Sequence, residues 1–194
     1  MIYNYVLCLG DSQTYGSRDE FGRAWPFELC DMLSEKYSQY WVPIVRAEPG
    51  LTSAGLLRAV YDWSNVSEVY KIVVLIGAND SREVVRTPPY IYQRNLEGIL
   101  RTLKVKHAAA SLFVCTVPDI GPFGSPDFTR ECQILIDEYN EVIHSLTAKW
   151  GYHIVDLTGL PVDCYADSVH FNNRGSREIA ARVMRAFEDV FEHV

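Results

Sequence analysis

Five short apolar runs alternate with stretches of helical periodicity, and this alternation restricts the fold more than any other feature of the chain. The clearest run, residues 71–76, reads KIVVLI, a continuous β-branched segment of the kind found in strands covered on both faces. Between the runs, apolar residues recur at spacings of three and four, as on one side of a helix. We expect strands at residues 5–9, 42–45, 71–76, 112–117 and 153–157, and helices at 26–37, 53–61, 92–103, 135–146 and 179–190.

Strands that alternate with helices predict a parallel sheet with right-handed crossovers and helices on both faces. We therefore expect a doubly wound, three-layer α/β/α sandwich, and the length of 194 residues favours a single domain over residues 1–194. In this architecture the carboxyl ends of all strands lie along one edge of the sheet, where sites form. Four stretches of small and polar residues follow strands and should meet there: residues 10–14, 50–53, 77–80 and 167–170.

The first of these stretches places Ser12 directly after a strand that ends near Gly10. Open α/β sheets put reactive groups at this position. Gly, Asp and Ser are also ordinary turn residues, so alone they favour a plain strand-to-helix turn. A nucleophilic serine would need a base, an acid that orients the base, and donors for an oxyanion.

The last stretch holds an acid and a base three residues apart, Asp167 and His170. A carboxylate at this spacing can reach the imidazole, fix its tautomer and stabilise its protonated form. An isolated pair of this kind is more often a solvated aspartate beside an unrelated histidine. Metal binding by Asp163, Asp167 and His170 is disfavoured, because no second His or Cys stands at ligand spacing.

The two middle stretches offer oxyanion donors. Asn79, in the segment that closes the KIVVLI strand, could donate from its side-chain amide. Gly50 could present its backbone N–H to the same oxyanion. Both residues are equally compatible with ordinary turns after a strand. Each signal is weak alone, but all of them occur together and at strand ends.

In this order, the motifs resemble those of the SGNH hydrolases, also called GDSL-type esterases and lipases, over nearly the whole chain from Gly10 to the last helix. The Ser, Gly, Asn and His that name the family correspond to Ser12 in GDSQT, Gly50 in PGLTS, Asn79 in GAND and His170 in DSVHFN. The serine motif reads Gly-Asp-Ser-Gln in place of Gly-Asp-Ser-Leu. It is not the G-x-S-x-G elbow of α/β-hydrolases, because a threonine stands where the second glycine would be.

The resemblance implies a flavodoxin-like five-stranded sheet and a catalytic triad of Ser12, Asp167 and His170. It also implies an oxyanion hole built from the backbone N–H groups of Ser12 and Gly50 and the side chain of Asn79. It implies no metal and no organic cofactor. The reaction expected from it is hydrolysis of a small-molecule carboxylic ester through an acyl-enzyme on Ser12.

The triad motifs do not choose among the family's lipases, thioesterases, lysophospholipases and carbohydrate deacetylases. The loop at residues 119–128 could line an acyl pocket with Phe123 and Phe128, or it could simply pack on the surface. Asp11 and Pro118 are the other substrate-binding candidates. We expect short acyl esters such as acetyl groups on a sugar, because no long exposed apolar stretch is visible. A lysophospholipase or thioesterase is the alternative.

Three charged residues after the GAND motif, Arg82, Glu83 and Arg86, could meet a polar substrate or form a solvated helix start. Two other classes of protein fit the fold. A non-catalytic binding protein would have no use for the full set of motifs. A nucleotide-binding module would need a phosphate loop, and GDSQTYG lacks both the GxGxxG and the GxxxxGK spacing. The net charge of −7 disfavours a nucleic-acid partner.

The remaining features concern location. No apolar run approaches the roughly 20 residues needed to span a bilayer, and the first residues lack the pattern of a signal peptide. The five cysteines are odd in number, and no two have CxxC spacing. We interpret them as reduced thiols, which predicts a cytoplasmic protein. The sequence carries no signal of oligomeric state.

Overall fold

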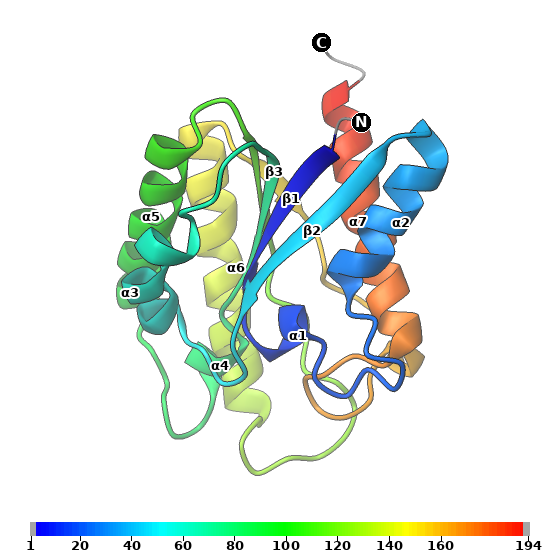
Figure 1. The fold of residues 1–194 in the computed structure, drawn as a ribbon. Helices are drawn as coiled ribbons and strands as arrows, with labels where there is room; N and C mark the ends of the chain where they lie inside the picture. The colour runs from blue at the N-terminus through cyan, green and yellow to red at the C-terminus, as the bar shows by residue number, and fades with distance from the viewer. Residues whose placement is uncertain (1–2, 192–194) are drawn as a thin grey trace.

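The structure, a computed structural model, describes residues 3–191 and contains one five-stranded sheet (Figure 1). All neighbouring strands are parallel, and their order across the sheet is β2-β1-β3-β4-β5. This is the order of flavodoxin-like sheets, and it confirms the predicted fold class. The strands are β1 (Tyr3–Gly10), β2 (Tyr40–Ala47), β3 (Val69–Leu75), β4 (Ser111–Cys115) and β5 (His153–Val155).

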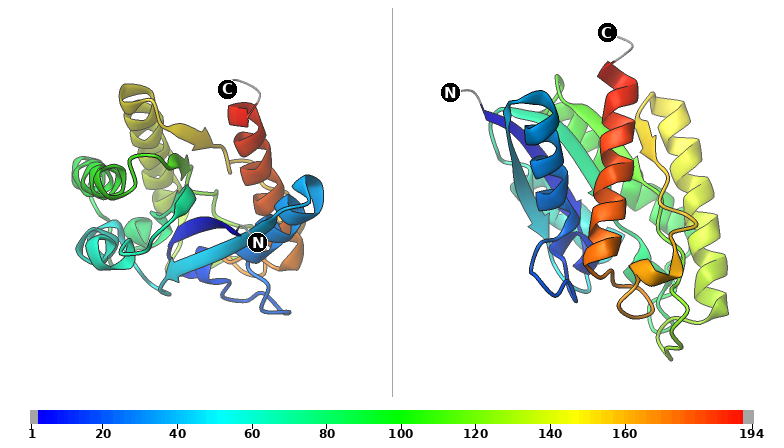
Figure 2. Two further views of the ribbon diagram at one scale, coloured as in Figure 1. Left: turned by 45° about the horizontal axis from the view of Figure 1, so that its top comes forward. Right: turned by 90° about the vertical axis from the view of Figure 1, so that its right-hand side faces the viewer.

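Helices form the two outer layers (Figure 1 and Figure 2). The first layer consists of α2 and α7, and the second, on the opposite face, consists of α3, α5 and α6. The long helices are α2 (Trp25–Tyr37), α3 (Ser53–Trp63), α5 (Pro89–Lys106), α6 (Arg130–Trp150) and α7 (Asn173–Phe191). The connections contain the single-turn helices α1 (Ser12–Tyr15) and α4 (Ala78–Ser81) and the 3-10 helix η1 (Val162–Cys164).

Each central strand contributes to two hydrophobic cores, because successive side chains point to opposite faces of a sheet. In β3, Val73 and Leu75 face the layer of α2 and α7, whereas Ile72 and Val74 face α3, α5 and α6. All four side chains are at most 1 % exposed. The continuous apolar run in the sequence is therefore the result of burial on both faces.

The second strand is longer than the sequence predicts. β2 continues for the eight residues Tyr40–Ala47, although Pro43 lies within it and has no N–H for a sheet hydrogen bond. Within the described sheet β2 pairs only with β1, and an edge strand is where a sheet tolerates proline. The sequence pattern predicts only a short strand here. At the edge of the sheet, proline does not carry the energetic cost that it has in a central strand, so the strand can be longer.

The last helix also begins earlier than its apolar stripe, at Asn173 and not at residue 179. Within residues 3–191, no helix combines the length and the apolar composition that crossing a membrane requires. The five cysteines are buried free thiols: Cys8, Cys30, Cys115, Cys132 and Cys164.

The strand order creates a crevice at one end of the sheet. From the central strand β1 the chain passes to β2 on one side, and after α3 it returns across β1 to β3 on the other side. Ligands of doubly wound sheets bind where the order reverses in this way, at the carboxyl ends of the strands. The helices α1 and α4 begin at this end of β1 and β3, at the bottom of Figure 1.

Far from this crevice, at the start of β3, the side chain of Lys71 is buried: the residue is only 3 % exposed. Its Nζ donates a hydrogen bond to Ser111 Oγ at 3.2 Å and lies 5.4 Å from the ring centre of Phe113. Burial lowers the pKa of Lys71 from 10.5 to about 8. Between these values the unfolded chain binds a proton that the folded protein does not bind. The contribution of Lys71 to the free energy of unfolding therefore rises with pH over this interval.

We expect Lys71→Met to be more stable than wild type at pH 7.5, and this difference to shrink by about 3 kcal/mol as the pH approaches 10.5. The reason is that the burial penalty of the ammonium is fully present below pH 8 and disappears as the folded state loses its proton. Urea unfolding of both proteins at several pH values measures the difference, with Lys104→Met, exposed on α5, as control. If the difference in the free energy of unfolding between wild type and Lys71→Met does not change with pH, this account is contradicted.

Candidate active site

Ser12 is the first residue of α1, and the end of β1 holds it in place. Asp11 precedes it as the helix N-cap, and its carboxylate accepts a hydrogen bond from the N–H of Gln13 at 2.9 Å. At Gly10 any Cβ would lie 2.3 Å from the hydroxyl oxygen of Thr14 and 2.4 Å from the carbonyl oxygen of Leu75. Only glycine fits there. Because it has no side chain, the turn that carries Ser12 can lie directly against β3.

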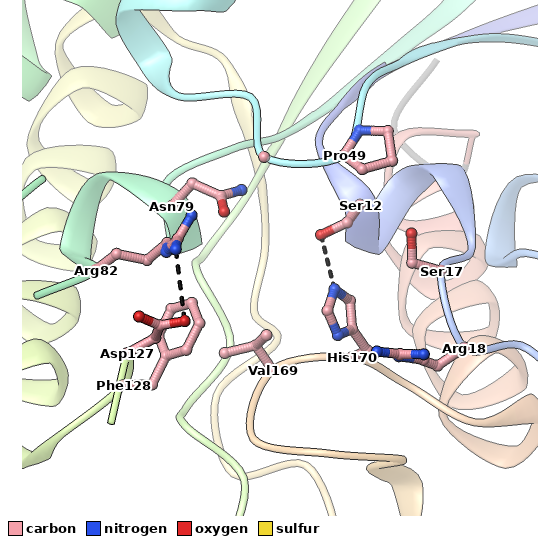
Figure 3. A pocket seen from close by; sticks show the side chains of 11 residues that line it. Ser12, Ser17, Arg18, Pro49, Asn79, Arg82, Asp127, Phe128, Val169 and His170 are labelled. Carbon is pink, nitrogen blue, oxygen red and sulfur yellow. Dashed lines mark hydrogen bonds and ion pairs between the residues drawn. The ribbon is translucent and has the colours of Figure 1, made fainter. Parts of the chain in front are cut away.

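His170 contacts both Ser12 and Asp167. Its Nε2 lies 3.0 Å from Ser12 Oγ (Figure 3), and its Nδ1 lies 2.8 Å from Asp167 Oδ2. The three side chains thus form a chain of hydrogen bonds from hydroxyl to imidazole to carboxylate. This is the arrangement that lets an imidazole remove a proton from a serine while a carboxylate fixes its tautomer.

Hydrogen bonds hold Asp167 in its ionised form. Burial raises the pKa of this carboxyl, but donation from the Val169 N–H, the His170 ring and the His170 N–H outweighs burial and lowers the pKa below its usual range. The two backbone bonds, at 3.0 Å and 2.8 Å, both end on Oδ1. Oδ2 is thereby left to face the imidazole and the guanidinium of Arg18, whose Nε is 3.5 Å away.

Gln13 connects the serine helix to the histidine segment. Its Nε2 donates to the carbonyl oxygen of Val169 at 2.8 Å, and the side chain is buried. This bond joins residues 156 positions apart. Gln13 stands where the family motif GDSL has leucine, so the departure from the motif has a structural role that sequence reasoning missed.

Asn79 lies on α4 with its side chain directed toward the serine (Figure 3). Its Nδ2 donates to Asp11 Oδ2 and to the carbonyl oxygen of Leu51, each at 3.1 Å. The Asp11 carboxyl is fully buried. Burial raises the pKa of Asp11 to about 7, and the repulsion from Asp80 adds to it, although hydrogen bonds from Gln13 and Asn79 oppose the rise.

Asp80 fixes the loop that carries Gly50. Its two carboxylate oxygens accept hydrogen bonds from Ser53, Oδ2 from the N–H at 2.7 Å and Oδ1 from the hydroxyl at 2.6 Å. Asn95 donates to the same hydroxyl at 3.0 Å. Gly50 itself has φ +83°, a conformation that favours glycine. Sequence reasoning missed Asp80 and Ser53, since their contact exists only when β1, β2 and β3 end side by side.

The backbone N–H groups of Ser12 and Gly50 form no hydrogen bond within residues 3–191. Both residues line the same pocket as His170 and Asn79. A backbone N–H without a partner in the protein can serve a developing negative charge without first breaking a bond. The structure thus brings together every residue expected in the triad and the oxyanion hole.

A pocket of about 500 Å³ opens above these groups. Beside Ser12, Asn79 and His170, its walls include Arg18, Arg82 and Phe128 (Figure 3). Sequence reasoning did not single out Arg18, which lies in the loop after α1, where no pattern marks it.

Of the four predicted substrate-binding residues, only Phe128 lies in the pocket wall. Asp11 is below the surface and engaged in capping α1, and Pro118 is buried beside β4. Phe123 is 47 % exposed outside the pocket, and its carbonyl oxygen accepts a hydrogen bond from Ser168. The structure therefore places these three elsewhere: Asp11 and Pro118 are buried, and Phe123 lies where the loop folds back on the histidine segment.

The three charged residues after GAND separate in the structure. Arg82 faces the pocket, where its Nη2 lies 3.5 Å from Asp127 Oδ2, whereas Arg86 pairs with Glu83 outside it. In the part of the chain that the structure describes, no group of three or more His, Cys, Asp and Glu is placed to hold a metal. Asp163, a member of the disfavoured metal set, pairs with Arg174.

Residues 8–178 match the model of a family described as the GDSL-like Lipase/Acylhydrolase family. In fold the chain is similar to an aryl esterase from M. smegmatis, with a TM-score of 0.81 and 15% identity over 96% of this chain and 99% of that one. It is also similar to a carbohydrate acetylesterase from Sinorhizobium meliloti, with a TM-score of 0.79 and 13% identity over 96% and 99% of the two chains.

A third similar structure is a lipase/acylhydrolase from Enterococcus faecalis, with a TM-score of 0.79 and 21% identity over 94% of each chain. At such identities these three structures show likeness of fold alone. A search of curated protein sequences found no match.

The contact between Asp80 and Ser53 should matter for stability. We expect Asp80→Ala to lower the free energy of unfolding by on the order of 3 kcal/mol, because it leaves a buried N–H and a buried hydroxyl without their acceptor. Urea unfolding measures the loss, and Asp62→Ala, exposed on α3, is the matched control. A loss no larger than that of the control would show that the carboxylate does not hold the loop.

Proposed function

The chain belongs to the GDSL-like lipase/acylhydrolase family and is an ester-hydrolysing serine hydrolase, and from this premise we propose that Ser12, His170 and Asp167 are its catalytic triad. The observation that carries the proposal is the unbroken chain of hydrogen bonds, 3.0 Å from Ser12 Oγ to His170 Nε2 and 2.8 Å from Nδ1 to Asp167. These atoms lie at the switch point of a doubly wound sheet, where such folds bind ligands.

In the first half of the reaction, His170 Nε2 takes the proton of Ser12 as Oγ attacks the ester carbonyl carbon. Asp167 stabilises the imidazolium that forms. The carbonyl π bond becomes an oxyanion, and the tetrahedral intermediate then collapses. The bond to the alcohol oxygen breaks, and His170 gives its proton to that oxygen. The alcohol leaves, and the acyl group remains on Ser12.

In the second half, water takes the place of the alcohol. His170 removes a proton from the water as its oxygen attacks the acyl carbon, and the imidazolium then returns that proton to Ser12 Oγ. The carboxylic acid leaves, and the enzyme is regenerated. The proton that His170 takes in each attack is returned in the following collapse, so the protons balance in both halves, and one water is consumed per ester cleaved.

The oxyanion of both intermediates would be held by the N–H groups of Ser12 and Gly50 and by Asn79 Nδ2. The two backbone groups support this role because neither has a hydrogen-bond partner among the described residues. Asn79 would exchange its bond to the neutral Leu51 carbonyl for one to the oxyanion. That exchange is favourable because hydrogen bonds to a charged acceptor are the stronger ones.

For the substrate we propose short acyl esters, with acetyl groups on a carbohydrate as the first class to test. A carbohydrate acetylesterase and an aryl esterase among the similar folds are compatible with this choice. The charged side chains of the pocket, Arg18, Arg82 and Asp127, favour a polar ligand over a long lipid chain. Lysophospholipase or thioesterase activity is the second candidate, supported by the apolar surface that Phe128 adds to the wall.

Labelling with a fluorophosphonate, read by intact mass, tests the nucleophile. We expect one adduct on wild type, none on Ser12→Ala and little on His170→Ala, because the probe reacts with a serine whose proton a base removes. Ser17→Ala is the matched control, since Ser17 lines the same pocket but it is Ser12 that His170 Nε2 contacts, and it should label like wild type. An unlabelled, folded wild type would favour the non-catalytic binding protein.

Steady-state kinetics on p-nitrophenyl acetate test the oxyanion donor. We expect Asn79→Ala to lower kcat by roughly a hundred- to a thousand-fold with little change in KM, because the lost bond forms only as negative charge develops. The matched control is Asn173→Ala, at the first residue of α7. A rise in KM alone would assign Asn79 to ground-state binding and remove it from the oxyanion hole.

A further inference from the structure

We propose that the ion pair between Arg82 and Asp127 closes the acyl end of the pocket and makes the enzyme selective for short acyl groups. The inference rests on the proposed function, because it takes the reacting ester to lie between Ser12 and His170. It adds the residues that decide acyl length, which neither the motifs nor the family assignment identifies.

The wall that carries this pair is built from two segments that are far apart in the sequence. Arg82 follows the last turn of α4, and its Nη2 lies 3.5 Å from Asp127 Oδ2. Directly beside the pair, the N–H of Glu83 donates to the carbonyl oxygen of Asp127 at 3.1 Å. The Thr129 hydroxyl donates to the Glu83 carboxylate. The side-chain pair is thus supported by bonds that do not depend on it.

The other side of the same loop is fixed to the histidine segment. The N–H of Gly121 donates to the carbonyl oxygen of Ser168 at 2.7 Å, and the hydroxyl of Ser168 donates to the carbonyl oxygen of Phe123. A Cβ at Gly121 would lie 2.8 Å from the Asp167 carbonyl oxygen, so the loop approaches as closely as glycine allows. The loop therefore bridges α4 and His170, and it cannot move away from the pocket without losing bonds on both sides.

The reaction geometry tells which part of an ester meets this wall. The leaving oxygen must lie beside His170 Nε2, which gives it a proton, and the oxyanion must lie near Asn79 and Gly50. The remaining substituent of the tetrahedral carbon is the acyl chain. In Figure 3, Arg82, Asp127 and Phe128 occupy the end of the pocket across from Ser12 and His170. The acyl chain would extend toward them, and the alcohol would lie on the side of Ser17 and Arg18.

An alkyl chain that reached this wall would strip water from charged groups. The Arg82 side chain is 32% exposed and that of Asp127 is 50% exposed, so both are hydrated. A methylene chain displaces this water and offers no hydrogen bond in return, which opposes binding. An acetyl group, with a single carbon beyond the carbonyl, would displace the least of this water. The pair therefore disfavours long acyl groups in two ways: it occupies the space that they would need, and they would have to displace its hydration water.

The test is the acyl-chain profile of purified enzyme on p-nitrophenyl acetate, butyrate and octanoate, in which the alcohol is constant. Wild type should prefer acetate. In the double variant Arg82→Met, Asp127→Leu, the ratio of kcat/KM for octanoate to that for acetate should rise by about ten-fold or more, because the wall becomes apolar. Arg86→Met is the matched control, since Arg86 lies four residues on and pairs with Glu83 outside the pocket. Its ratio should equal that of wild type.

Two outcomes would overturn the inference: an octanoate-to-acetate ratio that stays at the wild-type value in the double variant, or a wild type that prefers octanoate. A merely structural effect would lower both rates together and leave the ratio unchanged. Should the double variant fail to fold, Arg82→Gln combined with Asp127→Asn removes both charges, leaves the backbone bond to Glu83 in place, and should shift the ratio in the same direction by a smaller factor.

A second substrate series tests whether the pair lies at the acyl end or the alcohol end of the pocket. In this series, acetates of p-nitrophenol, naphthol and glucose are measured on the same variants. A change confined to this alcohol series would place the pair at the alcohol end and refute the assignment. Failure of the proposed function looks different, because wild type would then hydrolyse no ester in a Ser12-dependent manner.

Discussion

β1 pairs in parallel with β2 on one side and with β3 on the other, and the active-site end of the molecule depends on this double pairing. It places the ends of three strands within hydrogen-bonding reach, so that Ser12, Gly50 and Asn79 enter one crevice from three connections. Gly10 permits it, because β1 ends against the backbone of β3 with no room for a side chain. The positions of the crevice residues are thus set by the backbone pairing of the strands, which holds a site more precisely than contacts among side chains do.

Two buried carboxylates then fix the connections to one another. Asp11 joins α1 to Asn79, and Asp80 joins α4 to the loop before α3. Burial raises the pKa of both groups, so ionising either carboxyl costs stability relative to its protonated form. The bonds that their oxygens accept offset this cost, and removing a carboxylate would leave the buried donors without a partner. Here the two carboxylates hold the two oxyanion candidates that are not on the serine helix.

The opposite wall of the crevice is not positioned by strand pairing. It is formed by the loop at residues 119–128, which has no regular structure and is fastened by bonds to α4 on one side and to the histidine segment on the other. Loops held by a rigid scaffold are where related enzymes differ in substrate. This loop adds Asp127 and Phe128 to the pocket wall, and its bonds to Ser168 tie it to the segment that carries His170.

The sequence by itself determined the fold class and pointed to the candidate triad. Apolar periodicity marked all five strands, because burial on both faces leaves a continuous run such as residues 71–76. Asp167 and His170 were visible because their contact is local, three residues apart on one turn. Only the tertiary structure decided the rest. Gln13 meets Val169 across 156 positions and Arg82 meets Asp127 across 45. Such contacts depend on how the loops pack at the end of the folded sheet, and no periodicity or spacing along the chain predicts that packing.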